Sequence, residues 1–398
     1  TKFNNIMIMP LLVLGILIIL LVTFGIIEFQ IHLQSLNNIP LRIHVNGTRG
    51  KSSVTRLIAA GLRAAGIKTY AKVTGTSPRV IDNRGIDRII HRLRLPSIGE
   101  QVRLMRFFAK EKPEAVVMEC MAVQPQYQWI AEHQMIKAHI GVITNVRPDH
   151  LEEMGPTEND VAMSLCNTVP INSTLITGES DKPEILKKVA KNNNTAFIKS
   201  DEKSIKKEEL NRFTYIEHPS NIAVALDACK LAGVKRSVAL DGMQKVRPDS
   251  GALIFWELFK ENKMIKFVNG MAANDPVSTL QIWYQISERF QTQTHTCIFF
   301  NSRDDRPDRT RQMIELTMND IKPNYFIIRG DKVDQLIKKE KVNSPKTEVE
   351  TIPLNLRYES VVEKILELPK DTLVFAIGNQ VGAGQSILEK ISAFRRND

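Results

Sequence analysis

The stretch LRIHVNGTRGKSSVTRL, residues 41–57, decides the fold of this 398-residue chain. Its first five residues, Leu41–Val45, predict a strand, and Ser52–Ala65 predicts a helix with one apolar face. Between them, NGTRGKS matches the phosphate-loop pattern G-x-x-x-x-G-K-[ST], except that Val45 replaces the first glycine. Backbone N–H groups and the helix dipole attract phosphate at such a turn. We predict a nucleotide site, because an ordinary glycine turn requires neither lysine nor serine.

The residue types of this loop predict their roles. Lys51 is expected to neutralise phosphate oxygens, and the Ser52 hydroxyl to ligate Mg²⁺. Gly47 would make the turn, and Gly50 would let the backbone approach the phosphates. Whether Arg49 faces ATP or the substrate stays open. The predicted ATP-binding residues of the loop are Gly47, Thr48, Arg49, Gly50, Lys51, Ser52 and Ser53.

Two further predicted strand ends carry polar residues. The apolar run Ala115–Met118 is followed by Glu119, and beside a phosphate loop this carboxylate is more simply a Mg²⁺ ligand than a surface residue. The strand predicted at Ile140–Thr144 opens into a loop with an amide, a carboxylate and an imidazole, those of Asn145, Asp149 and His150. Asp149 and His150 could bind a second metal or orient a substrate amine, and an ordinary turn is the alternative. Because parallel strands end at one edge of a sheet, we expect all these residues in one crevice.

Strand-like and helix-like runs alternate along the rest of the chain, which predicts an α/β fold with parallel-rich sheets. Further strands are expected at 67–73, 174–177, 195–198, 265–268, 296–300, 325–328 and 373–377. The turn-forming sequence VRPDSG at 246–251 is the expected domain hinge. We therefore divide the chain into an anchor with its linker, a nucleotide-binding domain and a smaller α/β domain, at residues 1–40, 41–246 and 247–398.

Residues 6–27 form a run of 22 residues without a charge, about 33 Å long as a helix at ~1.5 Å per residue. That length crosses a hydrocarbon layer of ~30 Å and exceeds the ~7–15 apolar residues of a cleaved signal peptide. We predict a single-pass, uncleaved membrane anchor, followed by a linker that ends at Pro40. Flanking charges do not reveal its orientation, since Lys2 balances Arg42.

The net charge of +10 is concentrated in one segment. Residues 41–110 contain 15 Lys or Arg residues, 11 of them Arg, against three acids. This segment is a solvated basic face, a contact for an anionic membrane surface, or a site for carboxylate or phosphate groups, which guanidinium binds in a bidentate way. No nucleic-acid motif accompanies it, so no nucleic-acid partner is predicted. Four isolated cysteines indicate a reducing compartment rather than a disulfide framework or a zinc site.

Taken together, NGTRGKS, the strand-end Glu119 and TNVRPDH at 144–150 resemble the Mur ligase superfamily, which includes peptidoglycan-precursor ligases and folylpolyglutamate synthetase. Further motifs resemble the poly-γ-glutamate synthase ligase subunits of that superfamily, and they lie at 96–101, 119–123, 150–157, 268–275 and 301–310. The resemblance extends over essentially the whole chain and includes the N-terminal membrane helix. It implies a Mur-ligase-like central domain and a Rossmann-like C-terminal domain.

This resemblance implies an ATP-dependent amide ligase that releases ADP. ATP would phosphorylate the γ-carboxylate at the end of a growing poly-γ-glutamate chain, and the amine of the next glutamate would attack the acyl phosphate. Mg²⁺, with Mn²⁺ as the alternative, would be held by Ser52, Glu119 and His150. The implied catalytic residues are Lys51, Glu119 and His150.

Further binding residues follow from the same resemblance. Asn221 would meet the adenine, although a helix N-cap is the alternative for this residue. Asn274, from the second domain, would close over the nucleotide. The implied substrate-binding residues are Thr74, Thr76, Arg79, Asn145, Asp149, Arg303 and Arg306. For the arginine and aspartate cluster at 303–309, a salt-bridged helix start is the alternative.

Glutamate, poly-γ-glutamate and small membrane subunits are the implied partners, with the catalytic domains on the cytoplasmic side, where ATP is available. The choice of D- or L-glutamate, the product length, homo-oligomerisation and a carbamylated lysine stay open. Two other functions also stay open: an ATPase component of a polymer export complex, and a Mur-type ligase for another acidic substrate.

Overall fold

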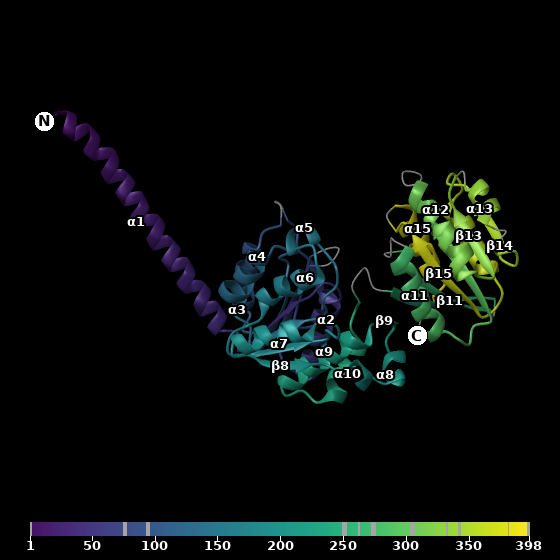
Figure 1. Ribbon diagram of the computed structural model, residues 1–398, viewed down its shortest axis with the longest axis horizontal. Coiled ribbons are helices and arrows are strands. Elements are labelled where there is room, and N and C mark those ends of the chain that lie inside the picture. The colour runs from purple at the N-terminus through teal and green to yellow at the C-terminus, as the bar shows by residue number, and fades with distance from the viewer. Residues whose placement is uncertain are drawn as a thin grey trace. The chain divides into compact units, whose positions relative to one another are not determined.

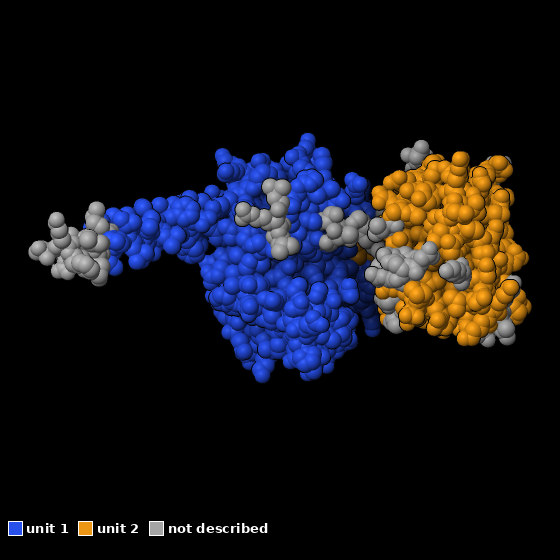
Figure 2. Space-filling model, turned by 90° about the horizontal axis from the view of Figure 1, so that it is seen from above, with its two compact units in different colours: residues 1–212, 218–249 blue, residues 213–217, 250–398 orange. Residues whose placement is uncertain are grey.

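The computed structural model contains two compact units, each an α/β structure as predicted. The first unit comprises Thr1–Arg212 with His218–Asp249, and the second comprises Phe213–Glu217 with Ser250–Asp398 (Figure 2). The structure describes residues 2–74, 78–92, 96–248, 253–261, 263–271, 276–302, 307–331, 333–340, 344–380 and 382–395.

A sheet of eight strands forms the centre of the first unit. Its strands are β1 (Leu41–Asn46), β2 (Thr69–Val73), β3 (Arg79–Ile81), β4 (Asp87–Ile89), β5 (Ala115–Glu119), β6 (Ile140–Ile143), β7 (Thr174–Thr177) and β8 (Ala196–Lys199). Their order is β4-β3-β2-β5-β1-β6-β7-β8. The pairs from β2 to β8 are parallel, and β3 and β4 extend the sheet as an antiparallel edge. Since β1 lies between β5 and β6, the strand ends that carry the predicted site residues are neighbours.

Helices cover both faces of this sheet (Figure 1). Tyr70, Val116 and Met118 pack with α3 (Gly99–Lys110) and η1 (Ala131–Ile136) in one apolar cluster. Because successive side chains of a strand point to opposite faces, α2 (Lys51–Ala64), which contacts β2 and β5, covers the other face together with α9 (Pro219–Leu231) and α10 (Arg236–Gln244). The remaining helical segments of the unit are α4 (Pro125–Ile130), α5 (Leu151–Met154), α6 (Glu158–Leu165), η2 (Cys166–Thr168), α7 (Pro183–Asn192), η3 (Glu202–Ser204) and α8 (Lys207–Asn211).

The N-terminal helix, α1 (Lys2–Asn37), is longer than predicted. The expected linker at 28–40 is wrong for residues 28–37, which continue the helix because neither Gly nor Pro interrupts the chain between Gly25 and Pro40. The end of α1 is fixed to the first unit: Leu36 is buried in the α3 cluster, and the Arg42 guanidinium donates to the Leu36 carbonyl (2.7 Å). The segment Pro10–Asn37 is long and apolar enough to cross a membrane.

The second unit is built on a seven-stranded sheet with the order β14-β13-β12-β15-β11-β10-β9. The strands are β9 (Tyr215–Ile216), β10 (Leu253–Lys260), β11 (Lys263–Asn269), β12 (His295–Asn301), β13 (Tyr325–Arg329), β14 (Glu348–Ile352) and β15 (Thr372–Gly378). One face packs against α14 (Tyr358–Glu367) and α15 (Ala383–Ser392), and the other against α11 (Pro276–Arg289), α12 (Pro307–Leu316) with η4 (Thr317–Ile321), and α13 (Asp334–Glu340).

Strand β9 departs from the sequence-based division of the chain. Residues 213–217 lie within the predicted 41–246 domain, yet β9 pairs antiparallel with β10 and belongs to the second unit. The Arg289 guanidinium of α11 donates to the Phe213 carbonyl (3.1 Å) and so fixes this segment. A strand of two residues carries no detectable periodicity, which is why the alternation pattern did not reveal it.

A buried histidine on β1 links the sheet to η1. The Nδ1 atom of His44 lies 2.7 Å from Oε2 of Glu132, whose other oxygen accepts from the Ala138 N–H (2.9 Å). Burial alone would lower the pKa of His44, but the nearby Cys120 and Glu132 side chains outweigh this effect and raise the pKa to about 9. The protonated imidazole therefore stabilises the fold.

We expect the His44–Glu132 pair to make the first unit less stable at alkaline pH. Because the folded pKa is raised above the ordinary 6.5, the contribution is complete below pH 6.5 and is lost as the pH rises through about 9. Urea unfolding at pH 6.5 and pH 9.5 should show a loss of roughly 3 kcal/mol in the wild type that is absent from His44→Gln. An equal loss in both proteins would contradict this assignment.

Candidate active site

The phosphate loop occupies the four residues between β1 and α2, Gly47–Gly50. Gly47 has φ 129°, and a Cβ atom there would lie 2.0 Å from Thr144 Oγ1. Gly50 has φ 78°, and a Cβ atom there would lie 2.6 Å from Asn221 Oδ1. Both positions therefore require glycine. Val45, in contrast, is a fully buried residue of β1, and this strand position needs no glycine.

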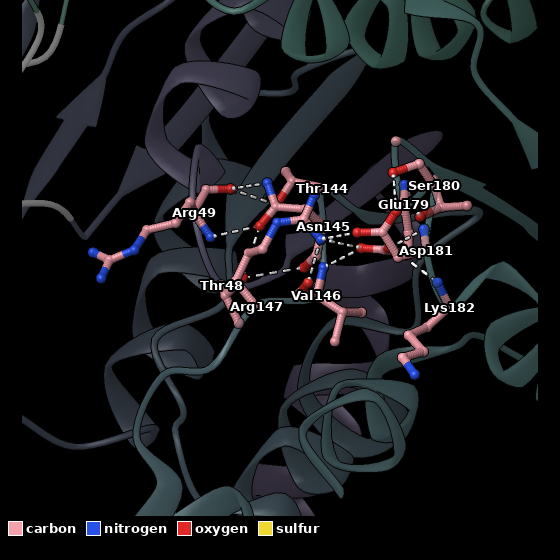
Figure 3. Close-up of polar contacts among 12 residues, drawn as sticks. Thr48, Arg49, Thr144, Asn145, Val146, Arg147, Glu179, Ser180, Asp181 and Lys182 are labelled. Atoms are coloured by element: carbon pink, nitrogen blue, oxygen red, sulfur yellow. Dashed lines mark hydrogen bonds and ion pairs between the residues drawn. The ribbon is translucent and has the colours of Figure 1, made fainter. Parts of the chain in front are cut away.

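The loop after β6 holds the phosphate loop in place (Figure 3). Asn145 Oδ1 accepts from Thr48 Oγ1 (2.7 Å) and from the Arg49 N–H (3.1 Å). Asn145 Nδ2 donates to the Arg49 carbonyl (3.0 Å), and Thr144 Oγ1 donates to the same carbonyl (2.6 Å). The Asn145 side chain, predicted to bind substrate, thus contacts the nucleotide loop.

Lys51, the first residue of α2, also contacts this loop. Its Nζ donates to the carbonyls of Gly47 (2.6 Å) and Thr48 (3.2 Å). The ammonium group is therefore held over the loop, on the side chain that the sequence predicts to neutralise phosphate. Ser53, the third residue of α2, is half-buried.

Glu119 connects three segments at the centre of the site. This residue is 2% exposed, and its Oε2 accepts from Ser52 Oγ (2.9 Å) and from the Thr74 N–H (2.6 Å). The Thr74 hydroxyl donates to Oε1. Ser52 from α2, Thr74 after β2 and Glu119 at the end of β5 are therefore in direct contact, although they lie far apart in the sequence.

The chemistry of Ser52 and Glu119 fits Mg²⁺. A carboxylate and a hydroxyl are hard oxygen donors, and Mg²⁺ is held in proteins by one or two such groups while phosphate and water oxygens complete the octahedron. Among the described residues, no group of three or more His, Cys, Asp or Glu side chains could hold a metal ion by itself. The residues present thus fit a metal that binds together with a nucleotide.

Asp149 and His150 form the outer part of the site. Asp149 Oδ1 lies 3.9 Å from Arg49 Nη2 and 4.0 Å from His150 Nε2. The side chain of Arg49 is 75% exposed and that of His150 is 52% exposed. The Arg49 and His150 side chains are therefore open to a substrate, and no contact among the described residues joins His150 to Ser52 or Glu119. His150 as a metal ligand stays a prediction.

Asn221 lies against the phosphate loop at Gly50. Helix α9 begins with Pro219, and its N-cap is His218, whose Nδ1 accepts from the Ser220 N–H (3.2 Å). The alternative of an Asn221 N-cap is therefore wrong, because the rigid φ of proline starts the helix two residues earlier.

The basic segment is more internally paired than its composition suggests. Arg79 lies 3.8 Å from Asp87, which also receives a bidentate pair of bonds from the buried Arg56. Arg92 donates two hydrogen bonds to Glu100. Arg79 is thus held at the β3–β4 edge by an acid. The predicted residues Thr76, Asn274, Arg303 and Arg306 lie outside the described residues.

Glu179, after β7, is a buried residue of the site that the sequence did not reveal. It is fully buried, and its carboxylate accepts from the N–H groups of Val146 (2.6 Å), Asp181 and Lys182 (3.0 Å) (Figure 3). It thereby holds the loop that carries Asn145. The sequence signal was present: four strand residues, TLIT, followed by Gly-Glu, repeat the pattern of an apolar strand that ends in an acid.

Lys72, near the end of β2, is a second residue that the sequence did not reveal. It is fully buried, and its Nζ lies 3.6 Å from Glu100 Oε1 without a hydrogen bond to the described residues. Burial lowers the pKa of Lys72, and the nearby Glu100 and Glu119 oppose this effect only in part. A lysine inside an apolar strand, two residues before Thr74, was the available signal.

Comparisons with known proteins agree with this geometry. Residues 45–246 match the Mur ligase middle domain, and residues 256–394 match the poly-gamma-glutamate synthase CapB C-terminal domain. The capsule biosynthesis protein CapB of Bacillus anthracis is 36% identical over 397 residues, 98% of this chain and 85% of the relative. The PGA synthase CapB of Bacillus subtilis (strain 168) is 36% identical over 394 residues, 97% and 98% of the two chains.

The fold also matches a solved ligase. A folylpolyglutamate synthase from Thermotoga maritima superimposes with a TM-score of 0.61 at 15% identity, over 93% of this chain and 94% of that chain. Fold and phosphate-loop site together define an ATP-dependent amide ligase of the Mur type. Within that class, the chain belongs to the CapB family of poly-γ-glutamate synthases, which confirms the resemblance seen in the sequence.

Removal of the Asn145 side chain tests the contact between the two loops. Asn145→Ala loses two accepted bonds and one donated bond to the phosphate loop, so we expect ATP to bind about tenfold more weakly, or ~1.4 kcal/mol. Calorimetric titration with a non-hydrolysable ATP analogue measures the change. Asn167→Ala, whose amide bonds only to carbonyls near the end of α6, is the control. Unchanged ATP affinity with a raised KM for the acidic substrate would instead support the predicted substrate role.

Proposed function

We propose that this chain adds glutamate to the γ-carboxylate of poly-γ-glutamate, with ATP converted to ADP and phosphate. The observation that carries the proposal is the contact of Ser52, Thr74 and Glu119 beside the phosphate loop, in a chain of the CapB family. The contact brings the first turn of α2 against the segment that follows β2, where the substrate loop is predicted. A phosphate donor and a carboxylate acceptor can meet there.

The reaction requires activation of a poor electrophile. A carboxylate becomes reactive toward an amine only when one of its oxygens is part of a leaving group, and phosphate transfer from ATP provides this. The Lys51 ammonium would give up a hydrogen bond to a loop carbonyl and donate to a phosphate oxygen instead. The N–H groups around Gly50 would stabilise the negative charge that develops. Mg²⁺, or Mn²⁺ in its place, would be held by Ser52 and Glu119 and supply further positive charge to the phosphate oxygens.

The outer residues are suited to the acidic substrate. Asp149 and His150 would orient the incoming amine, and the exposed Arg49 guanidinium beside them would attract a carboxylate. Thr74 would position the reacting carboxylate close to Glu119. Thr76, Arg79, Arg303 and Arg306 would bind other carboxylates of the polymer, and Asn221 and Asn274 would bind the nucleotide.

Membrane attachment through α1 is part of the proposal. The apolar side chains of residues 11–31 are exposed along α1, and their exposure to water is unfavourable. A hydrocarbon layer would cover them. Both units would then face the cytoplasm, where ATP is available. Because one helix cannot enclose a path for a charged polymer, small membrane subunits are the expected partners.

Glutamate-dependent product formation tests this function. The full chain, with and without the membrane subunits of its own synthase, is given ATP, Mg²⁺ and D- or L-glutamate, and the products are analysed for γ-linked glutamate. We expect ADP release that requires glutamate. ATP hydrolysis independent of glutamate, with no amide formed, would favour an export ATPase. Amide formation with a different acidic acceptor would favour another Mur-type ligase.

Glu119→Gln tests the metal site. The amide keeps the shape of the side chain but loses the charge that a divalent ion requires, so we expect turnover to fall on the order of 10²-fold and half-maximal activity to need more Mg²⁺. Glu114→Gln, just before the start of the same strand, is the control because Glu114 contacts the Lys68 N–H at the other end of β5. An unchanged Mg²⁺ dependence in Glu119→Gln would contradict the assignment.

A further inference from the structure

We infer that a groove between α1, α3 and η1 binds the headgroup of an anionic phospholipid. The groove has a volume of about 600 Å³ and is lined by residues of α1 from Gly25 to His32, by α3 and by η1. All three elements belong to the first unit. The inference rests on the proposed attachment of α1 to a membrane.

If α1 spans a membrane, the groove lies at the level of the lipid headgroups. The uncharged run ends at Ile27, and Glu28 is the first charged residue after Lys2. A span of 22 residues covers about 33 Å, so the groove begins where the hydrocarbon layer of ~30 Å ends. Figure 1 shows α1 reaching the first unit beside α3, so α3 lies next to the end of the membrane-spanning segment.

Two arginines of α3 give the groove its charge. Arg103 and Arg106 are three residues apart on α3, and both line the groove. Arg106 donates to the Glu28 carboxylate (3.2 Å) and carbonyl (2.8 Å), but its Nε has no partner among the described residues. Glu28 is the one acid among the described residues that line the groove. Guanidinium groups match phosphate oxygens in a bidentate way, which favours an anionic headgroup here.

His32 provides an independent sign of a missing ligand. It is 4% exposed, and among the described residues neither ring nitrogen has a hydrogen-bond partner of regular geometry, although backbone groups of Gln134 and Met135 lie beside it. A buried polar group without a partner is unfavourable. A phosphate or glycerol oxygen in the groove would satisfy the imidazole, since His32 lines the same groove as the two arginines.

Apolar residues that line the groove suit the apolar part of a lipid. Phe29 is 45% exposed, and Val102 and Met135 lie on the same groove. A Cβ atom added at Gly25 would meet nothing within 4 Å, so the upper end is open for an acyl chain that runs along α1. A helix of a membrane subunit could cover these apolar residues but would bury the two arginines without a matching anion, which is why we favour a lipid.

The test uses the full chain in vesicles of phosphatidylcholine alone or with phosphatidylglycerol, and measures which lipid stays bound after extraction by native mass spectrometry. We expect a preference for phosphatidylglycerol that falls about fivefold in Arg103→Ala, the factor that corresponds to ~1 kcal/mol per basic residue at an anionic surface. Arg103→Lys should keep most of the preference. Glu28→Gln should increase it, because this variant removes the one acid that lines the groove. Lys110→Ala, at the other end of α3, should leave it unchanged.

Three results would each be decisive. Failure to bind vesicles of either composition would overturn the membrane attachment of α1, and with it this inference. Equal retention of both lipids by the wild type and all variants would overturn the headgroup site while leaving membrane attachment intact. Occupation of the groove by a membrane subunit, shown by a cross-link from Val102→Cys that persists with anionic lipid present, would likewise overturn the lipid assignment.

Discussion

The buried carboxylate of Glu119 is the constraint on which the site depends. Glu119 is only 2% exposed to water, and burial of a carboxylate costs free energy unless hydrogen-bond donors surround it. Ser52 and Thr74 provide those donors, and in doing so they bring α2, β2 and β5 together at one edge of the sheet. The same oxygens suit a divalent ion. In the proposed function, stability without a nucleotide and chemistry with one would therefore use the same three side chains.

A second set of contacts makes the phosphate loop part of the sheet edge. Glu179 accepts a hydrogen bond from the Val146 N–H, and the neighbouring Asn145 accepts from Thr48 and Arg49. A continuous series of hydrogen bonds therefore joins the segments that follow β7, β6 and β1. The two glycines of the loop permit this close approach, because a side chain at either position would overlap with Thr144 or Asn221. The loop is therefore shaped before ATP arrives, which lowers the entropic cost of binding.

Much of the fold follows from the sequence, because long apolar runs alternate with amphipathic stretches. The central strand β1, its neighbours β5 and β6, and α2 all lie where periodicity and the glycine loop place them. The β3–β4 hairpin and β9 were not predicted, since strands of two or three residues lack a period. The end of α1 was also mispredicted, although the absence of Gly and Pro between Gly25 and Pro40 was a signal for it; the burial of Leu36 against α3 is a tertiary contact that the sequence does not show.

For the candidate site, the sequence predicted the positions of several residues in the fold but not their contacts. Lys51, Ser52 and Glu119 lie where strand ends and a helix start must bring them. The partners of Asn145 could not be predicted, because they depend on which atoms face each other across two loops. Glu179 and Lys72 were missed since a lone charged residue in or just after a strand is ordinarily solvated. Their burial becomes visible only when the sheet order is known.

Strand β9 affects how this chain folds during synthesis and how it can be divided into fragments. The chain leaves the first unit at Arg212, contributes Phe213–Glu217 to the second unit, and returns at His218 before it leaves again after Asp249. During synthesis, β9 emerges before its partner β10 exists, so its pairing must wait until about 40 further residues have left the ribosome. A fragment that ends near residue 246 would likewise carry an orphaned strand, and the remaining fragment would expose the unpaired edge of β10, a template for aggregation.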